Sequence, residues 1–392
     1  MKDNKQLSPH KIVAGGFFAL FLAMAVGRFA FTPILPIMQS NYGFSNTIAG
    51  NIASINYLGY LLGAILSKYV KNNNTQYAIY KVSLIICILS TAAMTFSHTI
   101  FSWYFWRFII GIASGFLNVL GVAFVLQSLA LLGKSHISGW MFCGVGTGIA
   151  LTGIAVPALN TILTADQIWL GLSVLSIIPF YFGWTAVKKV ELQHNLSTTA
   201  SNNKNPMIKK LYISYFLEGF GYIITATFIV SILTKTLNSI YAANVSWILI
   251  GISAAVTTLI WPKISNKFGA RKSLITAFLI QSVAIILPLM IPNTFGYIIS
   301  AIGFGGTFLG IVAMTLSYGR EISPQASNKV IGDLTILFGI GQIISPVIAG
   351  YLADIYGNFN ISIIIAFFSV ILAAIILLPM GKFMNEQKLQ SK

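Results

Sequence analysis

The sequence has few charged residues, and acidic residues are the rarest of them. Asp and Glu account for only 8 of the 392 residues, the four charged types together for 8%, and hydrophobic residues for 56%. Soluble globular domains carry about 25% charged residues, so this composition excludes a soluble protein with a fully solvated surface. Together with a mean hydropathy of +0.82, it indicates a chain with most of its length in a membrane.

The sequence also lacks the residue patterns of several function classes. Its two cysteines, Cys87 and Cys143, fall in different apolar runs, which argues against a disulfide framework. No complete Gly-x-x-x-x-Gly-Lys-Ser/Thr phosphate-binding motif occurs, so ATP is not expected to drive the protein directly. The 4 histidines are scattered through termini and loops without metal-ligand spacing. We therefore expect no enzyme activity, no cofactor and no metal site.

The net charge of +16 does not indicate a nucleic-acid partner. A nucleic-acid-binding protein needs a basic face beside a solvated surface, whereas the Lys and Arg residues here lie between apolar runs. We interpret this charge as a signal of membrane topology.

Apolar runs broken at Gly, Pro, Asn and charged residues predict twelve membrane-spanning helices. A helix of about 20 residues crosses the hydrocarbon core of a bilayer. The first run carries Arg28 and is too long for a cleaved secretory signal, so we interpret it as a permanent helix. The predicted spans are Ile12 to Met38, Thr47 to Tyr69, Tyr77 to Phe96, Phe101 to Leu132, His136 to Ala158, Asp166 to Val187, Ile208 to Leu233, Tyr241 to Trp261, Arg271 to Ile291, Thr294 to Tyr318, Ser327 to Leu352 and Phe359 to Met380.

The only long polar connection divides the chain into two halves. Residues 188–206 contain Ser, Thr and Asn without apolar periodicity, which is typical of a flexible linker. This predicts six-helix bundles at residues 1–187 and 207–392. The basic residues of the loops and termini fall on one side of such an arrangement, with Lys235 alone on the other. Because Lys and Arg are retained in the cytoplasm during insertion, both termini are expected to be cytoplasmic.

A short segment repeats between the predicted halves. Residues 144–147, Gly-Val-Gly-Thr, match residues 339–342, Gly-Ile-Gly-Gln, at an offset of 195. Fixed-offset similarity between membrane halves is typical of transporters built from two related bundles, with the substrate site between them near the middle of the membrane.

With these features, the sequence resembles the major facilitator superfamily over nearly its whole length. Between the second and third spans, members usually carry Gly-x-x-x-Asp followed by basic residues, and here residues 63–68, Gly-Ala-Ile-Leu-Ser-Lys, have Ser67 in place of the acid. The matching loop of the second half, residues 266–272, has Asn266 at that position. The fourth span resembles the family's Arg-x-x-x-Gly pattern, beginning at Arg107. The resemblance implies two six-helix bundles around a cavity lined by the first, fourth, seventh and tenth helices.

The first span resembles one poorly characterised bacterial branch of this superfamily. Residues 27–33, Gly-Arg-Phe-Ala-Phe-Thr-Pro, followed by Tyr-Gly-Phe-Ser at 42–45, carry that likeness. The Gly-rich fifth span is similar to a stretch that marks many exporters, but it lacks their Gly-Pro pair. The branch implies no particular substrate.

Three ionisable side chains, Arg28, Arg107 and Glu218, lie well inside predicted spans. A charge at the centre of a bilayer costs about 2.5–3.5 kcal/mol on insertion scales, so such residues normally face a cavity or a partner. We expect the two arginines to bind an anionic group of the substrate, because a guanidinium keeps its charge and fits carboxylate or phosphate. The alternative for each is a structural brace to backbone carbonyls. Glu218, expected near mid-membrane, is the candidate for proton coupling because the protonation of a carboxylate depends on its solvation.

Neighbouring polar side chains extend these candidates. Tyr215 and Tyr222 lie three residues before and four residues after Glu218, and therefore share its helix face. Asn118 follows Arg107 by eleven residues, which is three helical turns. All three are candidates for substrate binding, and the alternative for each is ordinary contact between helices.

Asp333 lies near the cytoplasmic start of the eleventh span. It is a candidate for an inner gate if it pairs with Lys329 or Arg320. The alternative is an acid in a first helical turn, where the helix dipole favours it.

The sequence therefore predicts an all-α integral membrane protein of twelve helices in two six-helix bundles related by an internal repeat. We expect a secondary transporter of the bacterial inner membrane that works by alternating access, is coupled to protons, and carries a small organic anion, since two buried arginines stand against one glutamate. The alternatives are an exporter of amphipathic drugs or metallophores and a transporter-shaped sensor that binds its ligand without moving it. We expect a monomer whose partners are the bilayer, the substrate and protons.

Overall fold

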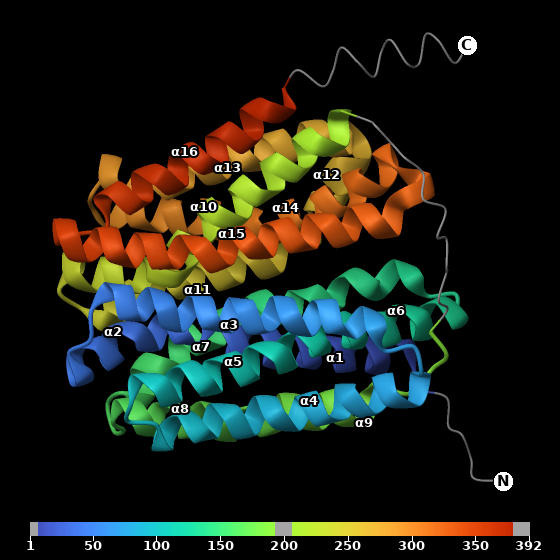
Figure 1. Cartoon of the computed structure of the whole chain (residues 1–392), viewed down its shortest axis with the longest axis horizontal. Coiled ribbons are helices and arrows are strands. Elements are labelled where there is room, and N and C mark those ends of the chain that lie inside the picture. The colour runs from blue at the N-terminus through green and yellow to red at the C-terminus, as the bar shows by residue number, and fades with distance from the viewer. Residues whose placement is uncertain (1–6, 193–205, 379–392) are drawn as a thin grey trace.

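The computed structural model describes residues 7–192 and 206–378, which fold almost entirely into helices, with no strand among them (Figure 1). Twelve helical stretches in these ranges are long and apolar enough to cross a membrane. The predicted all-α membrane fold and its number of spans are thus confirmed. Most of the predicted linker lies outside the described residues, so the domain division at residues 188–206 stays a prediction.

The first six spans include two π-helical segments, which are wider turns that often occur at functional sites. The elements of this half are α1 (Pro9–Leu20), the π-helical η1 (Phe21–Phe29), α2 (Phe31–Tyr42), α3 (Asn46–Leu66), η2 (Ser67–Tyr69), α4 (Asn73–Ala93), η3 (Met94–Phe96), α5 (Ile100–Phe116), the π-helical η4 (Leu117–Gly121), α6 (Val122–Leu131), η5 (Ser135–Phe142), α7 (Cys143–Leu159), α8 (Ala165–Leu175) and α9 (Ile177–Ala186). The first span consists of α1, η1 and α2, and the fourth of α5, η4 and α6.

The second six spans contain longer unbroken helices. The elements are α10 (Pro206–Leu237), α11 (Ile240–Thr257), the short α12 (Trp261–Phe268), α13 (Ala270–Met290), α14 (Thr294–Ile322), η6 (Pro324–Ala326), α15 (Ser327–Tyr356) and α16 (Asn360–Leu377). Because the number of spans is even, the start of the first span and the end of the last span lie on the same side of the membrane. We call this the terminal side.

A tight turn on the opposite side joins the first two spans. Helix α2 ends because Gly43 adopts a φ of +65°, a left-handed conformation that suits glycine. Ser45 then caps α3, its side chain accepting a hydrogen bond from the backbone N–H of Ile48 at 3.3 Å. This turn leaves the first residues of α3 partly exposed, with backbone N–H groups that have no partner within the helix.

The two halves pack against each other through a symmetric set of helices (Figure 1). Helix α3 lies along α15, α7 along α11, and α2 against α10. These are the second span with the eleventh, the fifth with the eighth, and the first with the seventh. Equivalent spans of the two halves are six places apart in the chain, so the contact of the second span with the eleventh corresponds to that of the eighth with the fifth. Such a symmetric set of contacts is what an internal repeat produces.

Glycines allow these helices to approach closely, as is usual between membrane helices. Gly50 of α3 faces the backbone of Pro346 on α15, and a side chain at Gly50 would collide with it. Gly146 of α7 and Gly251 of α11 lie against each other in the same way. The repeated glycine segment noted in the sequence thus contributes, at Gly146, to the contact between the halves.

Candidate functional site

Arg28 lies in η1 at the contact between the two halves and is only 3% exposed. Its Nη2 donates a hydrogen bond to Oε1 of Gln342 on α15. The guanidinium carbon lies 4.6 Å from the ring centroid of Tyr57 and 4.7 Å from that of Tyr60, both on α3. Its Nε has no hydrogen-bond partner, and no carboxylate of the described residues forms an ion pair with it. Arg28 is therefore a buried positive charge surrounded by aromatic rings and one neutral amide.

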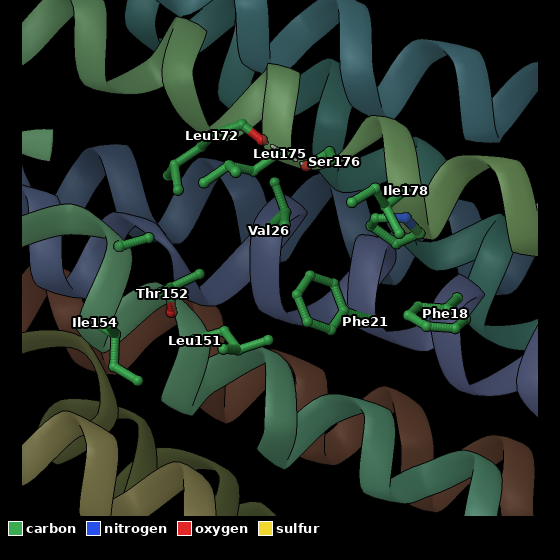
Figure 2. A pocket seen from close by; sticks show the side chains of 12 residues that line it. Phe18, Phe21, Val26, Leu151, Thr152, Ile154, Leu172, Leu175, Ser176 and Ile178 are labelled. Atoms are coloured by element: carbon green, nitrogen blue, oxygen red, sulfur yellow. Dashed lines mark hydrogen bonds between the residues drawn. The ribbon is translucent and has the colours of Figure 1, made fainter. Parts of the chain in front are cut away.

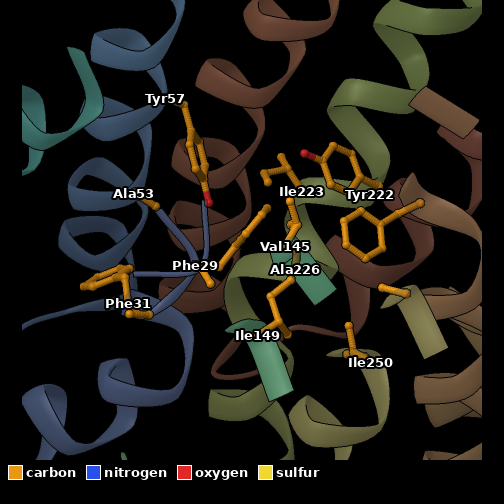
Figure 3. Close-up of a cluster of buried hydrophobic side chains, with 14 of the residues drawn as sticks. Phe29, Phe31, Ala53, Tyr57, Val145, Ile149, Tyr222, Ile223, Ala226 and Ile250 are labelled. Carbon is orange, nitrogen blue, oxygen red and sulfur yellow. The ribbon is translucent and has the colours of Figure 1, made fainter. Parts of the chain in front are cut away.

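Gln342 connects this charge to the seventh span. Its Nε2 donates to the hydroxyl of Tyr222 on α10 at 2.5 Å. Further from the terminal side than this hydrogen bond, the hydroxyls of Tyr57 and Thr227 lie 3.0 Å apart. Figure 3 shows Tyr57 from the first half and Tyr222 from the second among the side chains that meet here. The structure thus joins two of the predicted substrate-binding residues, Arg28 and Tyr222, through Gln342, whose only sequence signal is its place in the repeated segment.

A stack of five aromatic rings, which we call the ring ladder, continues from Tyr222 through the second half. Its neighbouring rings are within 16° of parallel, with centroid distances of 4.3, 5.3, 6.2 and 5.9 Å. In order, the rings are Tyr215, Phe338, Tyr222, Phe308 and Phe304. The predicted residue Tyr215 therefore belongs to the same assembly as Tyr222, although Phe338 separates their rings.

Arg107 of α5 is also buried, but its contacts stay within the first half. Its Nη1 and Nη2 donate to the backbone oxygens of Gly27 at 3.2 Å and Arg28 at 3.1 Å. Asn56 of α3 donates to the backbone oxygens of Gly27 at 3.3 Å and Arg107 at 2.8 Å. Since Gly27 and Arg28 lie in the π-helical segment, the guanidinium holds the backbone that carries Arg28. This geometry favours the bracing alternative for Arg107 over direct substrate binding.

Asn118 lies in the second π-helical segment, η4, and contacts the site through one side chain. Its Nδ2 donates to the hydroxyl of Tyr60 at 2.6 Å. Both residues are partly exposed, whereas Arg28 is buried. Because the second span runs towards the terminal side, Tyr60 and Asn118 form the terminal-side border of the Arg28 site.

Glu218 lies on the same helix as Tyr215 and Tyr222 but points towards the interior of the second half. It is 1% exposed, Gln281 of α13 faces its carboxylate, and its Oε2 has no hydrogen-bond partner. Neither polar atom of the Gln281 side chain has a partner either. Within the described residues no Lys or Arg forms an ion pair with Glu218. The carboxylate therefore faces α13 of its own half, and among the described residues it forms no ion pair with Arg28.

Asp333 contacts the start of the seventh span. Its Oδ2 accepts a hydrogen bond from the hydroxyl of Tyr212 at 2.9 Å, and in the described ranges no ion pair joins it to Lys329 or Arg320. Gly332, the residue before it, lies against the ammonium group of Lys68 at the end of the second span. Asp333 is thus close to a contact between the halves on the terminal side, while its own hydrogen bond stays within the second half.

On the opposite side, Asp354 joins the halves directly. Its two carboxylate oxygens accept four hydrogen bonds from the start of α3: from the backbone N–H and side-chain amide of Asn46, both at 2.9 Å, and from the backbone N–H and hydroxyl of Thr47, at 2.8 and 2.6 Å. A carboxylate at a helix N-terminus is stabilised by the free N–H groups and the helix dipole. Asp354 of α15 thereby caps α3 across the interface, a role that the sequence does not indicate.

The cavities of the described chain are mainly apolar. A cleft of about 820 Å³ lies between the halves on the terminal side, lined by the starts of α1 and α7 and by the end of α11. A second cavity of about 290 Å³ lies within the first half, where Phe21 and Val26 face Leu151 and Thr152 (Figure 2). The second cavity contains no charged side chain. The halves are therefore apart over part of the terminal side and joined on the opposite side.

Residues 20–378 match the protein family described as uncharacterised MFS-type transporter YbfB. The chain is 20% identical to the uncharacterized MFS-type transporter YceJ of Bacillus subtilis (strain 168) over 348 residues, 86% of this chain and 88% of the relative. It is 23% identical to the uncharacterized MFS-type transporter YcaD of Shigella flexneri over 388 residues, 95% and 96% of the two chains.

A shorter match and a structural match point to transporters of named function. Over 126 residues, 32% of this chain and 31% of the relative, the sequence is 26% identical to the multi-drug resistance efflux pump PmrA of Streptococcus pneumoniae. The crystal structure of a mutant of the nucleoside transporter NupG superposes with a TM-score of 0.78 at 16% identity, covering 94% of this chain and 99% of that one. At this identity the structural likeness shows a shared fold and no more.

Proposed function

The chain belongs to the family of MFS-type transporters represented by YbfB, and from this premise we propose that it moves a small organic anion across the membrane, with Arg28 as the anion-binding group. Membership of this family and twelve apolar spans make it a multi-pass secondary transporter of the inner membrane. The nature of the substrate, its coupling to protons and the cytoplasmic location of the terminal side are parts of the proposal.

One observation carries the choice of an anion: Arg28 is buried between the two halves without a carboxylate partner among the described residues. A buried charge without compensation is unfavourable by several kcal/mol. An anionic substrate group would supply the missing charge and could accept hydrogen bonds from the guanidinium in place of Gln342. The position suits transport because Arg28, Gln342 and Tyr222 belong to helices of both halves, which must move apart and together during alternating access.

Proton coupling is proposed through Glu218. The free energy of burying a carboxylate depends strongly on whether it is protonated. Glu218 has no cation partner among the described residues, and it lies one helical turn from Tyr222, which contacts the Arg28 site. A movement of α10 that admits water to Glu218 would therefore couple proton exchange to the state of the substrate site.

Export of amphipathic compounds is the second candidate function. It is supported by the partial match to a multi-drug efflux pump and by the apolar lining of the cleft between the halves. The two candidates differ in the charge of what they carry, since an anion carrier needs Arg28 and a carrier of neutral or cationic amphiphiles does not. A sensor would bind ligand and show no flux.

Metabolite profiling tests the proposal while the substrate is still unidentified. Cells with the chain, without it, and with Arg28→Gln are compared for compounds inside and outside. We expect the compounds that differ between the first two strains to be acids, and the Arg28→Gln strain to show them at the level of the strain without the chain. Differences confined to neutral or cationic amphiphiles, unaffected by Arg28→Gln, would contradict the proposal and favour the export candidate.

A further inference from the structure

Lys81 lies inside the third span, on the outer face of the first half. Helix α4 begins at Asn73, so Lys81 is about 12 Å along it at about 1.5 Å per residue. Helices α4 and α9 lie beside each other on the side of the first half that faces away from the second half (Figure 1). A lysine at such a depth normally extends its side chain towards the membrane surface. Side chains of a helix tilt towards its N-terminus, which here is the terminal side.

Two aromatic rings and a backbone oxygen surround the ammonium group of Lys81. Its Nζ lies 4.2 Å from the ring centroid of Trp184 on α9 and 5.1 Å from that of Tyr77 on α4, and it donates to the backbone oxygen of Trp184. The hydroxyl of Tyr77 donates to the backbone oxygen of Val187, just after α9, at 3.2 Å. Trp and Tyr are enriched where membrane helices reach the headgroups. We therefore place the ammonium group at the level of the lipid headgroups.

Two more lysines follow α9 on the same side. The charge of Lys188 is close enough to repel that of Lys81, and Nζ of Lys189 donates to the side-chain oxygen of Asn74 at the start of α4. Both Lys188 and Lys189 are exposed, and Lys81 is partly exposed. Neither α4 nor α9 contains Asp or Glu, and none of the three lysines forms an ion pair with a carboxylate in the described part of the chain. These residues, which we call the lysine cluster, therefore carry positive charge that no acid there compensates.

An apolar strip continues from the lysine cluster into the membrane. It consists of Val82, Ile85 and Leu89, which are exposed on one face of α4. A cavity of about 360 Å³ between α4 and α5 borders the strip at Val82 and is lined mainly by apolar side chains. The surface is thus positively charged at the headgroup level and apolar below it. An anionic phospholipid has the complementary parts in the same order.

From this order we propose that the lysine cluster and the apolar strip bind an anionic phospholipid of the terminal-side leaflet. Its phosphate lies at Lys81 and Lys188, where it relieves the repulsion between them, and an acyl chain lies along the strip. One lysine at a membrane surface favours an anionic lipid by about fivefold. Phosphatidylcholine has similar chains and a phosphate, but its positive choline group is repelled by the lysines. The site is separate from the Arg28 site and does not depend on the nature of the substrate.

Three probes separate the contributions of headgroup and chains. Dioleoylphosphatidylglycerol carries the net negative charge and the chains, dioleoylphosphatidylcholine carries the chains without net charge, and glycerol 3-phosphate carries the anionic group without chains. Their binding to the purified full chain is measured by titration with native mass spectrometry. The variants are Lys81→Gln, Lys188→Gln and Lys81→Arg, with Lys263→Gln as the matched control because Lys263 is an exposed terminal-side lysine on α12.

We expect phosphatidylglycerol to bind more tightly than phosphatidylcholine, and glycerol 3-phosphate not to compete with it. Lys81→Gln and Lys188→Gln should each weaken phosphatidylglycerol binding by about fivefold, whereas Lys81→Arg and Lys263→Gln should leave it unchanged. Lys188→Gln alters an exposed residue outside the helices, so it tests the site even if Lys81→Gln does not fold.

Three results would overturn the proposal. Equal affinity for the two lipids would show that the lysines do not select charge. An equal loss in Lys188→Gln and Lys263→Gln would show attraction by the overall positive charge rather than a site. Competition by glycerol 3-phosphate at the affinity of the lipid would show a site for free phosphate compounds. None of these results would affect the proposed function, because the Arg28 site takes no part in them.

Discussion

Replacement of Arg107 by Met should lower the stability of the fold, whereas the same replacement at Arg28 should not. Arg107→Met removes the two hydrogen bonds to the backbone oxygens of Gly27 and Arg28 and leaves those oxygens buried. Hydrogen bonds from charged donors contribute about 1.5–3 kcal/mol each in soluble proteins, and polar contacts between membrane helices about 0.6 kcal/mol on average. Part of this loss is offset because a buried charge disappears. We expect a net loss of about 1–3 kcal/mol.

Arg28→Met has the opposite balance. It removes one hydrogen bond to the neutral side chain of Gln342, and it also removes a buried charge that has no carboxylate partner in the described chain. Stability should therefore stay the same or rise, because an uncompensated buried charge is unfavourable. In the wild type, an anionic ligand at 100 times its Kd should add about 2.7 kcal/mol to the free energy of unfolding. Arg28→Met should lose this protection.

The two free cysteines provide the assay. Cys87 and Cys143 are both buried, so a thiol-reactive dye reports their exposure as the detergent-solubilised protein unfolds on heating. The three proteins are compared with and without an acid identified by metabolite profiling. An Arg107→Met variant with the wild-type unfolding temperature and no ligand protection would refute the bracing role. Equal destabilisation of both variants would refute the distinction between the two arginines.

Three further predictions concern coupling and movement of the halves. Glu218→Gln should preserve substrate exchange but abolish accumulation driven by a pH gradient, measured in proteoliposomes; continued accumulation would shift the role to another group or ion. Asp354→Asn removes a charge that accepts four hydrogen bonds across the interface and should weaken closure there by about 1–2 kcal/mol. Spin labels at Ile162 and Asn358 should then report a larger share of long distances, and an unchanged distribution would contradict this role. Gly50→Val should block closure of the same side, because no side chain fits between Gly50 and the backbone of Pro346. The variant should fold but not transport, and transport at the wild-type rate would contradict the close contact.

The fold was predictable because it depends on two strong signals. Apolar runs long enough to cross a bilayer leave little freedom in the number of spans, and all twelve predicted spans have counterparts in the structure. The weak repeat at residues 144–147 and 339–342 anticipated the symmetric contact of the halves, since close helix contacts need small residues wherever they occur.

The site was only partly predictable from the sequence. Ionisable residues inside spans are rare, so Arg28, Arg107 and Glu218 stood out in the sequence. The directions of their side chains, however, could not be derived from the 3.6-residue period of a regular helix. In the structure, Arg107 donates to the backbone oxygens of Gly27 and Arg28 in the π-helical turn of the first span, and neither this turn nor these contacts follow from the sequence. The position of Gln281 opposite Glu218 depends on how α10 packs against the rest of its own bundle.

Other participants carry signals too common to notice. Gln342 and Tyr60 are neutral polar residues of a kind that many membrane helices contain. Only their position opposite Arg28 gives them a role, and that position depends on how the two halves pack together. Asp354 was missed because an acid near the end of a span is compatible with an ordinary loop position, and its partners lie 307 and 308 residues away in the chain.

The central claim is that Arg28 binds the anionic group of a transported substrate. Counterflow measures this most directly: proteoliposomes loaded with an unlabelled acid identified by metabolite profiling are diluted into the same labelled acid, with no ion gradient. The wild type and a matched amount of folded Glu218→Gln should take up label transiently, whereas Arg28→Gln should take up no more than empty liposomes. Counterflow by Arg28→Gln at the wild-type rate would contradict the claim.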